Sequence, residues 1–365
     1  MGRNELAAWL RLLLTPGVGN DTGRKLLAAF GSPEAVWRQS PSTLKAVTSP
    51  RIAEALQQPP EAWDAAVDQL MTWLAEAANH HVLVLGDPAY PADLLQMADP
   101  PLLLYVLGQL SALQHPLRLA IVGSRNPTPQ GEANARQFAQ ALGASGVCVV
   151  SGLALGVDGA AHEGALEGGA PTIAVVGTGL DRVYPKRHLA LAHRIAAQGA
   201  IVSEYPLGTP PLAPNFPRRN RLIAGLSQGT LVVEAAVQSG SLITARLAAE
   251  QGREVFAIPG SIHAPQSRGC HALIRQGAKL VESAQDILED LRVPDPFAVR
   301  RAPSEPAAPE DDLLQAMGYD PVSLDALQAR TGLDTATLQA RLLELELDGE
   351  VSRMPGGLLQ RQGQG

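Results

Sequence analysis

Residues 147–158 read VCVVSGLALGVD, an apolar run that passes through a turn with two glycines into the start of a helical pattern. The apolar run bounded by glycine predicts a buried strand, and the spacing of apolar residues after the turn predicts a helix. The same order of strand, turn and helix recurs over residues 117–276. Such a pattern is typical of a parallel, doubly wound sheet, so the sequence predicts an α/β fold. Strands are predicted at 82–85, 102–106, 117–122, 147–151, 172–176, 200–203, 230–233 and 255–258, and helices at 131–142, 157–167, 189–198, 243–250 and 271–276.

The segments before and after this pattern predict further domains. Apolar residues at helical spacing predict helices across residues 5–79, with a sharp turn at 16–19. The backbone amides of such a turn can bind a phosphate. The segment has more acidic than basic residues, however, which favours a purely structural role as a tight turn between packed helices. Five prolines in 292–309 predict a linker. The predicted domains are residues 1–80 (helical), 81–290 (core), 291–309 (linker) and 310–365 (winged helix).

The winged-helix prediction depends on clear helix signals. Ser323 is the expected cap of a helix that Gly332 ends, and Asp334 is the expected cap of a longer second helix. Residues 351–360 then predict a β-hairpin that turns at 355–357. Residues 310–365 carry 10 acidic side chains against 4 arginines, and a DNA groove would repel a helix that acidic. The charge favours a protein-contact or structural role for this domain.

The distribution of charge matters more than its sum. The chain has a net charge of −7, which argues against nucleic acid at first sight. Residues 115–282, however, hold 15 Lys and Arg against 10 Asp and Glu, whereas both flanking segments are acidic. The middle of the chain is therefore a basic region that can bind a polyanion.

Several classes of protein are disfavoured by composition. The two cysteines, Cys148 and Cys270, lie far apart, and the eight histidines are scattered, so we expect neither a metal nor a cofactor. No run approaches the length of a membrane helix, and the N-terminus lacks a secretory pattern, so we expect a cytoplasmic protein without membrane contact.

Polar and basic residues follow the predicted strands where each strand ends. Because the carboxyl ends of parallel strands share one edge, we expect these loops to gather there and to bind an anion. Glycine beside serine lets backbone amides and hydroxyls approach a phosphate. The candidates in these loops are Gly123, Ser124, Arg125, Ser151, Gly152, Lys186, Ser239 and Ser241.

Residues 215–221 read NFPRRNR and form the densest cluster of guanidiniums in the chain. Arginine suits phosphate oxygens, and an exposed aromatic ring can stack on a base. The residue before a proline favours an extended backbone, so we expect the cluster to begin on a loop. The candidate ligands here are Phe216, Arg218, Arg219, Asn220 and Arg221. Together with the loops, they predict one phosphate-binding groove.

The sequence contains only incomplete or misplaced versions of known enzyme motifs. Residues 225–229 match GxSxG, but a helical pattern precedes the serine and a strand follows it, which reverses the order of a nucleophile elbow. No P-loop and no complete GxGxxG is present. Asp158, Asp181, Glu204 and Glu234 lie near glycine turns, where carboxylates more often cap helices or orient arginines. We therefore predict no catalytic residue.

Six motifs in order resemble the bacterial DNA-processing protein DprA (Smf) family across essentially the whole chain. They are GSR at 123–125, SGLAxGVDxxAH at 151–162, GLDxxYP at 179–185, FPxRNR at 216–221, SGSLIT at 239–244 and VFxIPG at 255–260. Gln130 stands where the family usually has an aromatic residue, and His271 replaces a common asparagine.

The resemblance implies a helical SAM-like N-terminal domain, a Rossmann-like core and a C-terminal winged helix. It implies a binding protein rather than an enzyme, one that coats single-stranded DNA and passes it to RecA recombinase in natural transformation. It also implies a homodimer built through the Rossmann-like core. The basic pocket of the family corresponds here to Arg125, Lys186, Arg219 and Arg221.

Two alternatives have other signatures. The core also resembles nucleotide-processing proteins of the lysine-decarboxylase-like (LOG) type, which hydrolyse nucleoside monophosphates and carry a PGGxGT turn in the core. The only similar stretch, Pro355-Gly356-Gly357, falls in the predicted winged helix and lacks the GT. A sequence-specific regulator acting through the winged helix is disfavoured by the acidity of that domain.

Overall fold

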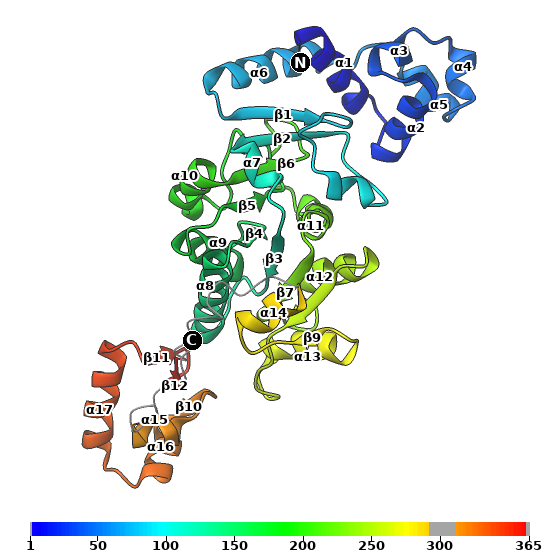
Figure 1. The fold of residues 1–365 in the computed structure, drawn as a ribbon. Coiled ribbons are helices and arrows are strands. Elements are labelled where there is room, and N and C mark those ends of the chain that lie inside the picture. Colours follow the sequence, from blue (N-terminus) through cyan, green and yellow to red (C-terminus); the bar gives the residue numbers. More distant parts are fainter. Residues whose placement is uncertain (1, 292–310, 363–365) are drawn as a thin grey trace. The chain divides into compact units, whose positions relative to one another are not determined.

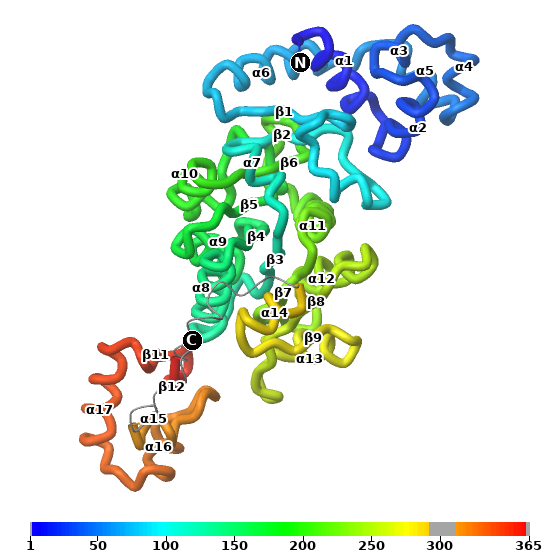
Figure 2. Tube along the Cα trace, in the orientation of Figure 1, coloured from blue at the N-terminus to red at the C-terminus, as the bar shows by residue number. Residues whose placement is uncertain are grey.

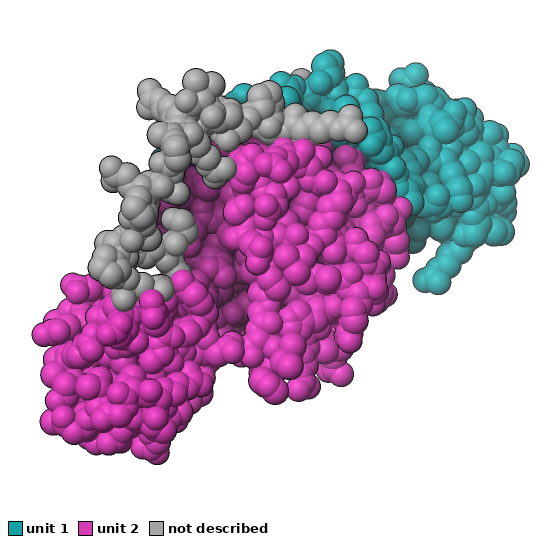
Figure 3. All heavy atoms as spheres, turned by 60° about the horizontal axis from the view of Figure 1, so that its bottom comes forward, with its two compact units in different colours: residues 1–116, 171–227 teal, residues 117–170, 228–365 magenta. Residues whose placement is uncertain are grey.

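The computed structural model describes residues 2–291 and 311–362. The chain forms two compact units, residues 1–116 with 171–227 and residues 117–170 with 228–365 (Figure 3). Each unit is built from two separate segments of the chain, and no segment begins or ends at residue 80. The predicted domain boundary at residue 80 stays a prediction. The predicted linker lies outside the described residues except for Leu291.

The first unit begins with helices, as the sequence predicts. Three of them start at a Ser-Pro pair, in which the serine hydroxyl accepts a bond from a first-turn amide and the proline occupies the first helical position. The helical pattern between residues 42 and 56 is consequently interrupted, because Ser49 and Pro50 start a new helix there. The helices are α1 (Arg3–Leu14), α2 (Asn20–Phe30), α3 (Pro33–Trp37), α4 (Pro41–Lys45), α5 (Pro50–Ala55) and α6 (Trp63–Glu76) (Figure 1).

Four strands complete the first unit, in the order β1, β2, β6, β5. β2 pairs antiparallel with both β1 and β6, whereas β5 and β6 are parallel. The sequence predicted these strands but not that β2 runs antiparallel to the other three. The elements are β1 (His80–Val84), η1 (Ala92–Gln96), β2 (Leu103–Gly108), α7 (Leu110–Leu113), β5 (Thr172–Val175), η2 (Lys186–His188), α10 (Leu189–Gln198), β6 (Ala200–Ser203) and α11 (Asn215–Gly225).

The second unit has five parallel strands in the order β4, β3, β7, β8, β9. β3 lies between β4 and β7, so the chain first extends the sheet on one side of β3 and later on the other. Such a reversal is the point where α/β sheets bind ligands, beyond the carboxyl ends of the strands. The elements are β3 (Arg118–Val122), α8 (Pro129–Ala144), β4 (Cys148–Ser151), α9 (Val157–Glu167), β7 (Gly229–Val232), α12 (Ser241–Glu250), β8 (Glu254–Ala257), η3 (Pro265–Ser267), α13 (Arg268–Arg275), β9 (Lys279–Leu280) and α14 (Ala284–Asp290).

Helices α8 and α9 lie side by side in this unit (Figure 2). Glycine permits their close approach, because a Cβ on Gly164 would lie 2.1 Å from the carbonyl oxygen of Arg136 and one on Gly168 would lie 2.4 Å from that of Gln140. Apolar residues from both helices and from β3, β4, β7 and β8 form one buried core. This core holds the strand ends that carry the candidate site.

The C-terminal segment has its own core, built from α15, α16, α17 and the hairpin. Ser323 and Asp334 cap their helices, Gly332 ends the first in a left-handed conformation, and the hairpin forms, so these predictions are confirmed. The sequence missed the first helix and the short third strand. The elements are α15 (Asp312–Met317), β10 (Val322–Ser323), α16 (Leu324–Thr331), α17 (Thr335–Leu347), β11 (Val351–Met354) and β12 (Leu358–Arg361). No helix within residues 2–291 and 311–362 has the length and apolarity needed to cross a membrane.

Candidate nucleic-acid interface

The candidate residues are divided between the two units, and each group is described within its own unit. Lys186 and the 215–221 cluster belong to the first unit, whereas the loops after β3, β4 and β7 belong to the second. The prediction that all of them form one groove stays a prediction.

The loop after β3 stands at the reversal point of the second unit. Gly123 is required there, because a Cβ would lie 2.7 Å from a methyl group of Val157 and 3.0 Å from the carbonyl oxygen of Glu234. The Ser124 hydroxyl accepts a hydrogen bond from the Asn126 amide at 3.1 Å and so shapes the turn. Arg125 is exposed at the tip of the loop. The turn therefore places an exposed guanidinium just beyond the carboxyl end of β3.

Glu234, which follows β7, fixes the far end of the same loop. Its carboxylate accepts hydrogen bonds from the amide of Thr128 at 2.9 Å and from its hydroxyl at 2.6 Å. The same hydroxyl accepts the amide of Gly131 at 3.0 Å and caps α8. Burial raises the pKa of Glu234, and the bonds from Thr128 oppose the rise. The carboxylate thus positions the loop, as expected of carboxylates beside glycine turns.

The loop after β4 differs from the prediction. Ser151 is fully buried, and its hydroxyl donates to the carbonyl oxygen of Ile121 at 2.6 Å, while Gly152 is buried beside it. Leu153 then has a φ of +58°, an uncommon left-handed backbone for a branched residue. Asp158 accepts the Ala154 amide at 3.3 Å across the turn. The predicted phosphate contact of the Ser151 hydroxyl is therefore corrected: this serine joins two strands.

Ser239 and Ser241 lie at the start of α12. Their hydroxyl oxygens are 2.6 Å apart, and the Ser241 amide donates to the Ser239 hydroxyl at 3.3 Å. Ser241 is buried and Ser239 is half-buried. The pair closes the turn into α12, and Ser239 is the more accessible of the two.

In the first unit, the loop after β5 lies against the start of α11. The Asn215 side chain donates to the carbonyl oxygen of Gly177 at 3.0 Å, and a Cβ on Gly177 would lie 3.3 Å from the Phe216 ring. Gly179 is required as well, because its Cβ would lie 2.7 Å from the carbonyl oxygen of Pro206 and 2.4 Å from a carboxylate oxygen of Asp181. That carboxylate also accepts the Gly208 amide at 2.7 Å. These contacts set the path of the chain into Lys186.

Helix α11 begins at Asn215, so the 215–221 cluster is helical from its first residue and the expected loop is wrong. Pro217 is the third residue of the helix, where a backbone amide has no intrahelical acceptor, so its missing N–H costs no hydrogen bond. The Phe216 ring lies 5.6 Å from the Tyr184 ring, and Tyr184 is 47% exposed. An aromatic pair at least partly open to solvent can stack on a base.

Lys186 and Arg218 are the accessible cations of this unit's candidate set. Both side chains are exposed, and neither forms a salt bridge with any residue that the structure describes. Lys186 opens the short helix η2, and Arg218 lies in the first turn of α11. Their charges are available to a phosphate.

Arg219, Asn220 and Arg221 are predicted as phosphate ligands, but none of the three is exposed. Arg219 is 4% exposed and donates to the carbonyl oxygen of Val175, and Asn220 is buried as well. Arg221 donates to the carbonyl oxygen of Asp99 at 2.7 Å and forms a salt bridge with Glu204, with side-chain exposures of 16% and 12%. The two guanidiniums are held by protein oxygen atoms, because α11 turns them toward the strands. Direct phosphate binding by them stays an untested prediction that this geometry does not favour.

Sequence reasoning missed the partners of Arg221. Asp99 precedes β2 and also accepts from Arg24 of α2 at 2.9 Å, so one carboxylate links α2 to α11. Burial raises the pKa of Glu204, and the charge of Arg221 opposes the rise. Asp99 lies 122 residues from Arg221 in the chain, and no motif marks it.

The remaining enzyme candidates have structural roles. Ser227 is fully buried after α11 and before β7, and its hydroxyl donates to the carbonyl oxygen of Ile223 at 3.0 Å, which confirms that the GxSxG match is accidental. Burial raises the pKa of the Cys148 thiol to about 12. Within residues 2–291 and 311–362, no group of three or more His, Cys, Asp or Glu side chains is placed to bind a metal ion.

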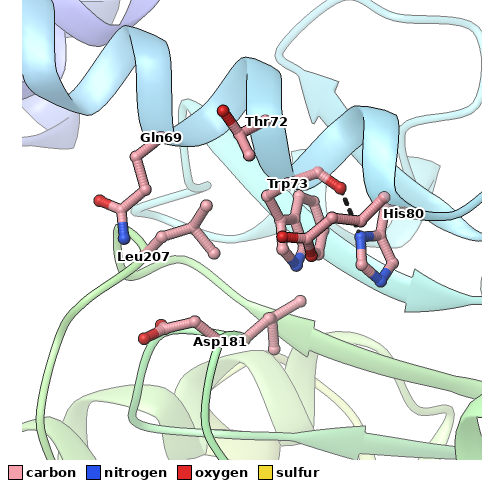
Figure 4. Close-up of a pocket in the computed structure, with 8 residues that line it drawn as sticks. Gln69, Thr72, Trp73, His80, Asp181 and Leu207 are labelled. Atoms are coloured by element: carbon pink, nitrogen blue, oxygen red, sulfur yellow. Dashed lines mark hydrogen bonds between the residues drawn. The ribbon is translucent and has the colours of Figure 1, made fainter.

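A pocket of about 440 Å³ lies in the first unit between α6 and the loops after β5 and β6. Figure 4 shows Gln69 and Trp73 of α6, with His80, on one side and Asp181 on the other. His80 stacks on Trp73 with ring centres 4.2 Å apart and shares a hydrogen bond with its carbonyl oxygen. Glu76 and Asp181 both line the pocket, so it disfavours a phosphate and is not included in the candidate interface.

The fold and the strand-end loops define an α/β protein that carries exposed basic residues beyond the carboxyl ends of its strands. A winged helix follows this α/β part in the chain. Residues 81–292 match the family model described as DNA recombination-mediator protein A, and residues 297–357 match the DprA winged helix domain. The chain belongs to the DNA recombination-mediator protein A family, and the sequence-based recognition is confirmed.

Known relatives agree with this assignment. Protein Smf of Escherichia coli K12 is 45% identical over 307 residues, which cover 80% of each chain. The crystal structure of DprA from Streptococcus pneumoniae has a TM-score of 0.68 at 37% identity and covers 80% of this chain and 98% of its own. A DprA structure from Helicobacter pylori, described for its single-stranded DNA binding mode, has a TM-score of 0.54 at 33% identity and covers 58% and 95%.

Proposed function

We propose that this chain binds single-stranded DNA through exposed cations at its strand-end loops and in the first turn of α11. Arg125 contributes in the second unit, and Lys186 and Arg218 contribute in the first, where Phe216 and Tyr184 offer rings to the bases. The observation that carries the proposal is the exposed Arg125 at the reversal point of the second unit, on a turn that Gly123 and Glu234 hold in place. The DNA binding described for the Helicobacter pylori relative supports it.

Phosphate contacts determine how such binding depends on salt. Each neutralised phosphate releases counterions, so the slope of log K against log salt changes by about 0.7 per contact on a single strand. Few aromatic side chains are present, so we expect little sequence preference.

The test is fluorescence anisotropy of a labelled thymidine oligonucleotide at several salt concentrations. We expect Arg125→Ala, Lys186→Ala and Arg218→Ala each to weaken binding and to flatten the slope by about 0.7. Arg194→Ala is the matched control, because Arg194 is an exposed arginine of α10 outside the candidate set. Unchanged slopes in all three variants would contradict the proposed contacts.

We further propose that the bound strand is passed to RecA recombinase during natural transformation, in the cytoplasm where recombination takes place. The family membership supports this step. An electrophoretic shift comparing single- with double-stranded DNA, repeated after RecA is added, tests it. A protein–DNA complex that blocks RecA filament growth rather than promoting it would refute the transfer.

A homodimer built through the core is proposed as the working form. Leu280 on the terminal strand β9 is 49% exposed, and Ile262 is 73% exposed in the same unit. A terminal strand presents a row of unpaired backbone N–H and C=O groups, which can pair with a second copy. We expect Leu280→Lys to shift sedimentation toward a monomer, with Leu189→Lys as an exposed control, and an unchanged sedimentation coefficient would place the dimer contact elsewhere.

We propose a binding role without catalysis. The nucleotide-hydrolase alternative is not favoured, because Pro355-Gly356-Gly357 forms the turn between β11 and β12 of the C-terminal segment rather than a loop of the core. Release of free base from nucleoside monophosphates by the purified chain would reverse this conclusion.

A further inference from the structure

Helix α17 of the winged helix has two apolar faces. Leu338, Leu342 and Leu345 are buried in the small core, while Leu343 and Leu347 are 52% and 79% exposed. Ala336 and Ala340 are exposed too, and the spacing 336, 340, 343, 347 places the four residues in one row along the helix. In Figure 1, α15, α16 and the hairpin all lie on one side of α17. This row, the α17 stripe, is separate from the face that holds the domain together.

The stripe is bordered by acidic side chains. Glu344 and Asp348 follow it on one side, are exposed, and form no salt bridge with any residue in the described part of the chain. Glu346 borders the other side and is paired with Arg353 at 2.9 Å. Arg341, the single cation of α17, is paired with Asp311 at 2.6 Å. The exposed surface of α17 is therefore apolar at its centre and negative at its margin.

The negative charge at the margin of the α17 stripe decides which kind of partner can bind it. A DNA backbone would be repelled, because no unpaired cation on α17 offsets the carboxylates. A second copy of α17 would place the same carboxylates opposite one another across the stripe, which is unfavourable. A segment with apolar residues flanked by lysine or arginine satisfies both the stripe and its margin.

The shape of the stripe favours a helical partner. Ala336 and Ala340 let another backbone approach closely at one end, and Leu343 and Leu347 project at the other. Alternating spacings of four and three residues are those of a coiled-coil seam, which recognises a helix through its own apolar row.

We propose that the α17 stripe docks a protein partner through an amphipathic helix whose apolar row is flanked by basic residues. The inference is independent of single-stranded DNA binding, which involves the other residues named above. The affinity for single-stranded DNA therefore serves as a control, because substitutions in α17 should leave it unchanged if the core remains intact.

The experiment uses the full chain and two synthetic helical peptides with the same leucine row, one flanked by lysines and the other by glutamates. Fluorescence anisotropy should show the lysine peptide binding at least about tenfold more tightly, because each like charge facing the margin is unfavourable. Leu343→Ser with Leu347→Ser should weaken the lysine peptide at least about tenfold, since both leucines lose their buried contact. Leu189→Ser, at a leucine that is 50% exposed on α10, is the matched control and should bind like the wild type.

A second variant separates docking from misfolding. Glu344→Lys with Asp348→Lys keeps the leucines and should reverse the preference toward the glutamate peptide, which an unfolded helix would not do. Equal binding of the lysine peptide by the wild type and the double serine variant would overturn the proposal. So would a serine variant that loses self-association in sedimentation, which indicates a second copy, or one that loses affinity for duplex DNA, which indicates a nucleic-acid helix.

Discussion

Replacing Arg221 by methionine separates a structural role from phosphate binding. The substitution removes a guanidinium that bonds to Glu204 and Asp99 and leaves a side chain of similar length. Asp99 keeps its bond to Arg24 at 2.9 Å, so Glu204 is the carboxylate that loses its cation. Because Glu204 is almost fully enclosed, it then lies in the protein as a poorly compensated charge.

The expected loss of stability follows from that burial. Breaking a buried pair by removing one partner typically costs 3 to 5 kcal/mol, and we expect about 3 kcal/mol because Arg221 retains some solvent contact. Replacing both residues by methionine removes the uncompensated charge, so the double variant should return to within about 1 kcal/mol of the wild type. The pKa of Glu204 is already raised by burial, so the carboxyl contributes stability below its unfolded pKa and loses it as pH rises. The deficit of Arg221→Met should therefore shrink as the pH is lowered.

The assay is urea unfolding followed by tryptophan fluorescence. All four tryptophans, Trp9, Trp37, Trp63 and Trp73, belong to the first unit, so the signal reports the unit that holds the pair. With a slope of about 2 kcal/mol/M, a loss of about 3 kcal/mol lowers the midpoint by about 1.5 M. Arg194→Met is the control for loss of an exposed arginine.

Two results would refute the reasoning. A midpoint lowered by less than about 0.3 M would show that the pair contributes little to stability. A folded double variant whose salt slope for single-stranded DNA falls by about 0.7 would show that Arg221 contacts a phosphate after all.

Three further predictions concern other parts of the fold. Gly164→Ala should destabilise the second unit by about 1 to 3 kcal/mol, because the new Cβ meets the carbonyl oxygen of Arg136 at 2.1 Å; a melting temperature equal to that of the wild type would contradict it. Glu234→Gln should flatten the dependence of stability on pH above about 4.5, because burial raises the pKa of Glu234 and its contribution is lost as pH rises; parallel curves for both proteins would argue against this role. Ser323→Ala removes the cap of α16, whose Ala326 amide donates to the hydroxyl at 3.2 Å, and should cost about 0.5 to 2 kcal/mol; amide hydrogen exchange over residues 324–331 that does not accelerate would count against it.

The regular part of the fold was predictable because its signals are local. The apolar run at 147–151 became β4 with one residue fewer, and the helix expected from residue 157 begins there as α9. Caps also act over three residues, which is why Ser323 and Asp334 could be assigned. Strand direction depends on the topology of the whole sheet, so no local sequence signal marks the antiparallel pairing of β2.

The candidate site was predictable by residue type but not by orientation. A serine beside a glycine looks the same whether its hydroxyl faces a ligand or, as in Ser151, the neighbouring strand. Arg218 and Arg219 are adjacent, yet the helix turns one outward and the other into the protein. Only the positions of Val175 and Asp99, both distant in the sequence, decide which guanidiniums remain available.

The discontinuous first unit has a consequence for synthesis. Gly108 at the end of β2 pairs with Ala200 of β6, so the ribosome adds about 90 residues after β2 before its partner exists. At 5 to 20 residues per second, this interval lasts about 5 to 20 seconds. Throughout it, β2 can pair only with β1, and one hydrogen-bonding edge of the nascent chain stays open to other chains. The order in which this protein leaves the ribosome therefore leaves one edge of β2 in need of protection from aggregation.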